Sequence, residues 1–153
     1  MADWELAQLN IALMRAPIDD PVMAAFAARL DEINAIADAA PGFVWRLQDD
    51  DGAATSFRPF GDDVLVNMSV WRDVEALKDY VLRSDHAQLL RRRKAWFERM
   101  EAAYSVMWWV PAGHRPSLAE AAERLERLRR DGPGSRAFTF RDSFPPPADG
   151  LHA

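Results

Sequence analysis

Two segments of this chain alternate apolar and polar side chains at every second position, and this alternation limits the folds available to it. In the segment 4–14 the odd-numbered positions from Ala7 onward are apolar, whereas Gln8 and Asn10 fall on the opposite side. The segment 64–71 repeats the pattern. A period of two is typical of a β-strand whose two faces differ. We therefore expect a sheet with one apolar face and one face of mixed polarity.

Segments with helical periodicity separate these strands and follow them. Asp20 is a good N-cap and Pro21 suits the first helical position, which predicts a helix that Pro41 and Gly42 bring to an end. A capping box at 117–120 opens another helix, which should add stability rather than chemistry. The other predicted elements are strands at 42–48, 104–110 and 137–141, and helices at 74–82 and 84–101.

This order of elements predicts an α+β fold: a ferredoxin-like split βαβ arrangement with an antiparallel sheet and an extra C-terminal helix. The 153 residues suit a single domain over 1–144, followed by a flexible Pro-rich tail over 145–153. The apolar rows of the two alternating strands are predicted to face the helices. The mixed face is too apolar for water and too polar for an ordinary core. We expect a second subunit to cover it, in a homodimer.

The composition excludes several classes of function. The chain has no cysteine, which removes disulfides and thiolate metal sites, and no acidic cluster has the spacing of a calcium loop, so we predict no metal site. The net charge of −5 argues against a nucleic-acid partner. No apolar run approaches the roughly 18 residues of a membrane span, and the N-terminus lacks the pattern of a signal peptide. We therefore expect a cytoplasmic protein that binds no membrane.

The mixed sheet face carries the candidate ligand-binding residues. Pockets are mainly apolar with a few placed polar groups, and this face combines amides and a hydroxyl with indole rings, Trp45 being a second candidate wall beside Trp71. The alternative is a dimer interface in which the amides satisfy one another. The candidate binding residues on this face are Gln8, Asn10, Asn67, Ser69 and Trp71.

Three further residues are candidates for chemistry. His86 and Arg93 lie two helical turns apart on an apolar stripe, where Arg93 could hold a carboxylate or an enolate and His86 could transfer a proton. The alternative places both at the edge of the stripe, with Arg93 reaching into solvent. His114 lies in a loop bounded by proline and glycine, where it could reach over a pocket mouth or simply be solvated.

Several motifs resemble known proteins. The order of elements, with VW at 70–71, VEAL at 74–77 and SDH at 84–86, resembles the dimeric α+β barrel superfamily, which includes the antibiotic-biosynthesis monooxygenase-like proteins. Over roughly the first 140 residues the chain is also similar to an uncharacterised bacterial family labelled a "domain of unknown function". The motifs that carry this second resemblance are QLNIA at 8–12, GFVWRL at 42–47, NMSVW at 67–71 and WWVPAGHRP at 108–116.

The resemblance also raises haem as a cofactor, because the superfamily contains haem-degrading monooxygenases. Their pattern pairs an Asn on the first strand with a Trp and a haem-ligating His on later helices. Asn10 matches the Asn, but the Trp position falls on Tyr80 and the His position on Leu90, which cannot bind iron. The residues therefore favour a protein without a cofactor.

Two functions follow as expectations. The resemblance and the mixed face together imply a cofactor-independent monooxygenase-like enzyme for a small conjugated or aromatic molecule. In that reading Asn10 and Asn67 orient the substrate's oxygens, Trp71 walls its ring, and His86 or Arg93 handles charge. The alternative is a non-catalytic dimer that binds a small molecule or haem, or that has a structural role.

Overall fold

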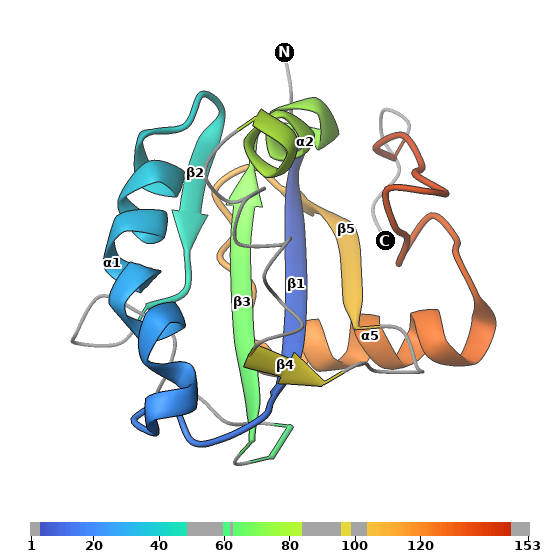
Figure 1. Ribbon diagram of the computed structural model, residues 1–153. Coiled ribbons are helices and arrows are strands. Elements are labelled where there is room, and N and C mark those ends of the chain that lie inside the picture. The colour runs from blue at the N-terminus through green and yellow to red at the C-terminus, as the bar shows by residue number, and fades with distance from the viewer. Residues whose placement is uncertain (1–3, 49–59, 62, 84–95, 99–103, 148–153) are drawn as a thin grey trace.

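An antiparallel sheet forms the centre of the protein, with helices on both of its faces (Figure 1). The computed structural model describes residues 4–48, 60–61, 63–83, 96–98 and 104–147. Within these residues the strands are β1 (Trp4–Met14), β2 (Phe43–Arg46), β3 (Val64–Trp71), β4 (Phe97–Glu98) and β5 (Ser105–Pro111). The helices are the 3-10 turn η1 (Pro21–Met23), α1 (Ala24–Ala39), α2 (Val74–Arg83) and α5 (Leu118–Asp131).

The central strand is β1, which pairs with β3 on one side and with both β5 and β4 on the other. Strand β2 pairs with the outer edge of β3, and every pairing is antiparallel. The spatial order β2-β3-β1-β5 is that of a split βαβ fold, because β3 lies between the two strands that α1 connects. The predicted α+β, ferredoxin-like class is therefore confirmed, and α5 is the extra C-terminal helix.

Local signals placed several elements correctly. The strands predicted at 4–14 and 64–71 have those bounds. Asp20 caps the first helical turn, since its Oδ1 accepts a hydrogen bond from the backbone N–H of Val22 at 2.9 Å, although the turn is 3-10 and the α-helix begins at Ala24. Ser117 caps α5 in the same way through Glu120.

The prediction of which sheet face the first two helices cover was wrong. Met23 and Phe26 pack against Leu65, and Leu77 of α2 packs against Trp71, so α1 and α2 cover the mixed face. The apolar rows face the other way, where Leu125 of α5 packs among them.

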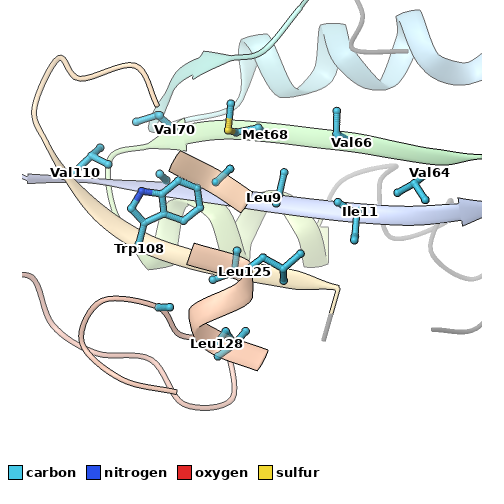
Figure 2. Packing of buried hydrophobic residues seen from close by; sticks show 14 residues of the cluster. Leu9, Ile11, Val64, Val66, Met68, Val70, Trp108, Val110, Leu125 and Leu128 are labelled. Atoms are coloured by element: carbon cyan, nitrogen blue, oxygen red, sulfur yellow. The ribbon is translucent and has the colours of Figure 1, made fainter. Parts of the chain in front are cut away.

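Figure 2 shows this apolar cluster, with Leu125 and Leu128 of α5 beside Trp108, Leu9 and Ile11. The mixed face thus lies beneath the protein's own helices, and the reason for expecting a second subunit to cover it no longer holds. A period of two identifies the residues that share a face, but it does not identify the element that packs on that face.

Two other predicted elements were also wrong. Residues 97–98 were predicted inside a helix but form β4, whose Phe97 pairs with Met14; most of the predicted span 84–101 lies outside the described residues. The predicted strand at 137–141 is instead two isolated bridges, one joining Phe138 to Met107 and one joining Gly134 to Ala137. Of the predicted tail, the structure describes 145–147 without a helix or strand, and 148–153 lie outside the described residues.

Gly42 lets α2 come close to the sheet. Its φ is +83°, and a Cβ atom at this position would lie 2.5 Å from the Cβ of Ala76. Its carbonyl oxygen also accepts a hydrogen bond from the backbone N–H of Arg72 at 2.7 Å. Only glycine combines this conformation with so close a contact, and the result is that α2 lies directly over the end of β3. None of the helices in the described ranges is both long and apolar enough to span a membrane.

Candidate ligand-binding site

A cavity of about 480 Å³ lies between the mixed sheet face and the elements that cover it. Strands β1 and β3 supply its central polar residues, and α1, α2, β2, β5 and the segment after α5 supply the rest. The apolar lining residues are Ala37, Phe43, Trp71, Leu77, Val81, Met107 and Phe140. The polar lining residues are Gln8, Asn10, Asn34, Arg46, Asn67, Ser69, Tyr80, Tyr104, Ser105, Thr139 and Arg141.

All five binding residues predicted on the mixed face line this cavity. They come together because Asn10 lies opposite Asn67, and Gln8 lies opposite Ser69, in the antiparallel pairing of β1 and β3. The catalytic candidates His86 and Arg93 lie outside the described residues, as does Leu90, so their roles remain predictions.

A hydrogen-bonded chain connects the polar residues on the cavity floor. The Nε2 of Gln8 donates to Asn67 Oδ1 at 2.7 Å and to Ser69 Oγ at 2.8 Å. Ser69 Oγ also accepts from the indole Nε1 of Trp71 at 2.7 Å. Gln8, Ser69 and Trp71 are all buried, so these bonds satisfy groups that have no access to bulk water. These hydrogen bonds therefore fix the Trp71 ring and the Gln8 amide in one orientation.

Asn67 differs from its partners because it is exposed to the cavity rather than buried. The strand pattern predicts for it either a ligand-orienting role or a cross-strand bond to Gln8, to Asn10 or to a partner subunit. The structure shows the bond to Gln8 and also places Asn67 in the cavity lining. Its Oδ1 accepts from Gln8, which leaves its Nδ2 as a donor on the cavity side. Beside it, Asn10 Oδ1 is buried and has no hydrogen-bond partner. A buried polar atom without a partner is costly, so the floor has unused capacity for hydrogen bonding.

Aromatic rings form one wall of the cavity. Trp71 stacks on Tyr80 with 5.1 Å between ring centroids and 28° between planes, and Phe43 meets the edge of Trp71 at 5.4 Å. Burial, with a smaller contribution from the charge of Asp38, raises the pKa of Tyr80 to about 12, and Arg46 opposes the shift. The phenol of Tyr80 therefore stays protonated at neutral pH and can donate a hydrogen bond.

Arg46 enters the cavity because β2 contains a bulge. The pairing of β2 with β3 shifts between Phe43 and Trp45, so that Phe43 and Arg46 both face the cavity side and Trp45 faces the other cluster. Trp45 is therefore not the second wall. The Nε of Arg46 lies 2.7 Å from Asp38 Oδ1, and its side chain is only 12% exposed, so Asp38 holds the guanidinium in place.

His114 lies away from this cavity. Its Nε2 lies 2.7 Å from Glu120 Oε1, and Glu120 Oε2 accepts from Trp108 Nε1 at 2.8 Å. These contacts tie the loop after β5 to the start of α5, on the opposite face of the sheet from the cavity floor. The structure thus gives His114 a contact with α5 and no place among the residues that line the cavity.

Sequence reasoning did not identify Arg46, Phe43, Tyr104 or the residues 139–141 as lining residues. The bulge shifts the register of β2, so period-two alternation does not place Phe43 and Arg46 on the same side of the strand. The segment 139–141 reaches the cavity only through tertiary contacts, and no local signal marks it. Tyr80 appeared in the sequence only as the position aligned with an aromatic residue of haem-degrading proteins, and it does present an aromatic ring here.

The chemistry of the described lining is that of neutral hydrogen bonding with two cations. Among these residues there is no carboxylate or imidazole, and no group of three His, Cys, Asp or Glu side chains that could hold a metal occurs in the described part of the chain. The arrangement suits a planar ligand that packs against Tyr80, whose ring stacks on the buried Trp71, and that presents oxygen atoms to the floor.

Several solved structures resemble the chain distantly. A protein of unknown function from Nitrosomonas europaea is 16% identical, with a TM-score of 0.47; the match covers 75% of this chain and 97% of that one. SnoaB, a cofactor-independent oxygenase from Streptomyces nogalater, is 22% identical, with a TM-score of 0.44 and coverage of 76% and 98%. The protein Rv0793 from Mycobacterium tuberculosis is 15% identical, with a TM-score of 0.47 and coverage of 74% and 99%. No curated protein matches the sequence.

The family comparison covers almost the whole chain. The match runs over residues 5–152 and so includes every strand and helix described above, apart from the first residue of β1. It confirms the resemblance that the motifs on β1, β2, β3 and β5 indicated. The protein therefore belongs to the family described as a domain of unknown function (DUF3291).

Proposed function

We propose that the cavity binds a small planar aromatic or conjugated molecule with oxygen substituents, and that the protein acts on it as a cofactor-independent monooxygenase-like enzyme. The proposal that the cavity binds such a molecule is supported by the residues on the cavity floor. There Gln8 and Ser69 fix a buried hydrogen-bonded chain, while the Asn67 amide faces the open space. The catalytic half rests on the sequence resemblance to monooxygenase-like proteins.

The floor offers a ligand one donor, Asn67 Nδ2, and one acceptor, the buried Asn10 Oδ1, so it favours an oxygen that can both accept and donate. Since Asn67 Oδ1 is occupied by Gln8, its Nδ2 is the group left for a ligand. An enol or phenol oxygen can accept from Asn67 and donate to Asn10, and Tyr80, whose ring stacks on the buried Trp71, packs against the attached ring system.

The proposed reaction needs molecular oxygen as its only co-reactant. A conjugated ketone with an activated methylene group loses a proton to a base, for which the sequence offers His86, and gives an enolate, whose negative oxygen the Asn67 amide would stabilise. The enolate supplies the electrons that reduce O₂. One oxygen atom becomes a new carbonyl at the former methylene carbon, and the other leaves as water. Overall CH₂ and O₂ give C=O and H₂O.

Asn67→Val tests the binding half. Valine suits the middle of a strand, but the variant loses one of the two acceptors of the buried Gln8 amide, which keeps Ser69. We therefore expect its free energy of unfolding to fall by at most about 1 kcal/mol. Its affinity for 2-naphthol, measured by quenching of Trp fluorescence, should fall about two- to tenfold, which is the value of one or two lost hydrogen bonds. Ser117→Ala is the control, because it weakens α5 without touching the cavity. Unchanged affinity in Asn67→Val would remove the basis of the proposal.

The alternative is a carrier that binds the same molecule without converting it. The absence of a carboxylate or imidazole from the described lining favours this alternative, since proton abstraction needs a base. Oxygen uptake with a planar aryl ketone that has an activated methylene group separates the two. Uptake that depends on both protein and ketone supports the enzyme, whereas tight binding without uptake supports the carrier. A Soret band in the purified protein, or a shift of the Soret band of added hemin relative to free hemin, would contradict the cofactor-independent proposal.

A further inference from the structure

The segment that follows α5 crosses the free edge of β5 and reaches the cavity. We name the residues 137–144 the C-terminal strap. Phe138 is fully buried, and its backbone exchanges two hydrogen bonds with Met107, of 2.8 and 2.9 Å. At the other end the carbonyl oxygen of Phe144 accepts a hydrogen bond from the indole Nε1 of Trp109 at 2.9 Å. The two ends of the strap are therefore fixed to neighbouring parts of β5.

The aromatic rings at these two ends also pack together. Phe138 lies 6.4 Å from Trp109 and 6.0 Å from Phe144, measured between ring centroids. Between these anchors Thr139, Phe140 and Arg141 line the cavity. Because the anchors are fixed, these three residues are held at the rim rather than left as a free terminus.

The rim residues have an unusual combination of properties. Phe140 is 42% exposed, which makes it one of the few large apolar side chains that the described surface shows to solvent. Arg141 is exposed, and no carboxylate among the described residues pairs with it. The other cation of the lining, Arg46, is held by Asp38, so its charge is compensated. The uncompensated positive charge at the described rim is therefore that of Arg141.

We propose that the C-terminal strap is the specificity element of the cavity and that the ligand is an aromatic acid. The proposal rests on the proposed function, since it requires that a planar molecule binds in the cavity against Tyr80. Phe140 covers the outer part of the ring system, and Arg141 pairs with an anionic substituent, such as a carboxylate, at the end of the ligand that faces solvent. The floor residues form hydrogen bonds with the ligand's inner oxygen atoms, and the strap pairs with the ligand's negative charge.

Two matched probes test this proposal. 2-Naphthoate and 2-naphthamide have the same ring and nearly the same shape, but only naphthoate is charged. We expect the wild-type protein to bind naphthoate about two- to fivefold more tightly at low salt, the usual value of one exposed ion pair. The preference should shrink as NaCl is added, because salt screens exposed charges. Both dissociation constants are measured by titration of Trp fluorescence.

Variants of the strap assign the effect. Arg141→Gln should bring the ratio of the naphthoate and naphthamide dissociation constants to about one, and Arg141→Lys should retain the preference for naphthoate. Arg136→Gln is the matched control, because Arg136 is an exposed arginine just before the strap that does not line the cavity. Phe140→Ala should weaken both probes by the same factor. Circular dichroism checks that each variant is folded.

Three outcomes are distinguishable. If neither probe binds to the wild type, the proposed function is wrong for planar aromatic molecules and the strap proposal is wrong with it. If both probes bind equally well, the cavity binds aromatic molecules but the strap does not read charge, which overturns this proposal alone. A preference that survives in Arg141→Gln and disappears in Arg46→Gln would also overturn it, because the anion would then lie at Arg46.

Discussion

The hydroxyl of Ser69 is the acceptor on which the cavity floor depends, and its removal should have a defined cost. Ser69 is 6% exposed and Trp71 is 1% exposed. The hydroxyl accepts from the Trp71 indole at 2.7 Å and from Gln8 at 2.8 Å. In Ser69→Ala both bonds are lost. Gln8 keeps Asn67 as an acceptor, but the indole N–H remains buried and loses the acceptor that it has in the structure.

The magnitude follows from this difference. A buried donor that loses its acceptor costs about 1–3 kcal/mol, and the Gln8 amide adds a smaller amount because it keeps one bond. We expect Ser69→Ala to lower the free energy of unfolding by about 2 kcal/mol, which is a large fraction of the roughly 5–15 kcal/mol typical of a domain. For a protein of this size that corresponds to roughly 4–8 °C in Tm.

Urea unfolding followed by circular dichroism measures this cost, with the slope of the transition expected to be unchanged. A double-mutant cycle with Trp71→Phe isolates the bond, because phenylalanine keeps an aromatic ring but has no N–H. In the Trp71→Phe background, Ser69→Ala should cost at least about 1 kcal/mol less than in the wild type. A cost below about 0.5 kcal/mol in the wild type, or an equal cost in both backgrounds, would refute the reasoning.

Three further predictions concern other parts of the molecule. Ser117→Ala removes the side-chain cap of α5, whose oxygen accepts from the Glu120 N–H at 3.1 Å, and should cost about 1 kcal/mol in thermal or urea unfolding with no change in ligand affinity. The pKa of Tyr80 is raised from 10.0 to about 12, so its contribution to stability is complete below pH 10 and is lost as the pH rises toward 12. Urea midpoints of Tyr80→Phe should therefore fall less steeply than those of the wild type over this range, and parallel curves would contradict the shift. The homodimer remains a prediction that rests on the family resemblance. Light scattering should give about twice the chain mass of 17.3 kDa. A monomer at micromolar concentration would contradict the prediction.

The elements that were correctly predicted from the sequence are those with local causes. The bounds of β1 and β3 follow from alternation, which depends only on the chain's own pleat. The starts of the first helical turn and of α5 follow from Asp20 and Ser117, whose side chains bond to N–H groups two and three residues away. Each of these features is specified within a few residues.

The errors have non-local causes. Residues 97–98 belong to a strand because Phe97 pairs with Met14, more than 80 positions earlier in the chain. Phe138 forms a bridge rather than a strand, because Met107 at the edge of β5 offers it a single pair of hydrogen bonds. The helical periodicity of 84–101 and the β propensity of 137–141 are local preferences. The tertiary contacts of Phe97 and Phe138 outweigh them.

The sequence by itself determined which residues share a face of the sheet, because a pleated strand turns alternate side chains to opposite sides. Alternation alone therefore groups Gln8, Asn10, Asn67, Ser69 and Trp71 on one face. Only the tertiary structure decided what covers that face. Alternation has no absolute direction, so it cannot tell whether α1 and α2 or α5 packs on a given row. The bulge in β2, the closeness of α2 at Gly42 and the anchored strap then completed the cavity, because each depends on contacts between segments far apart in the chain.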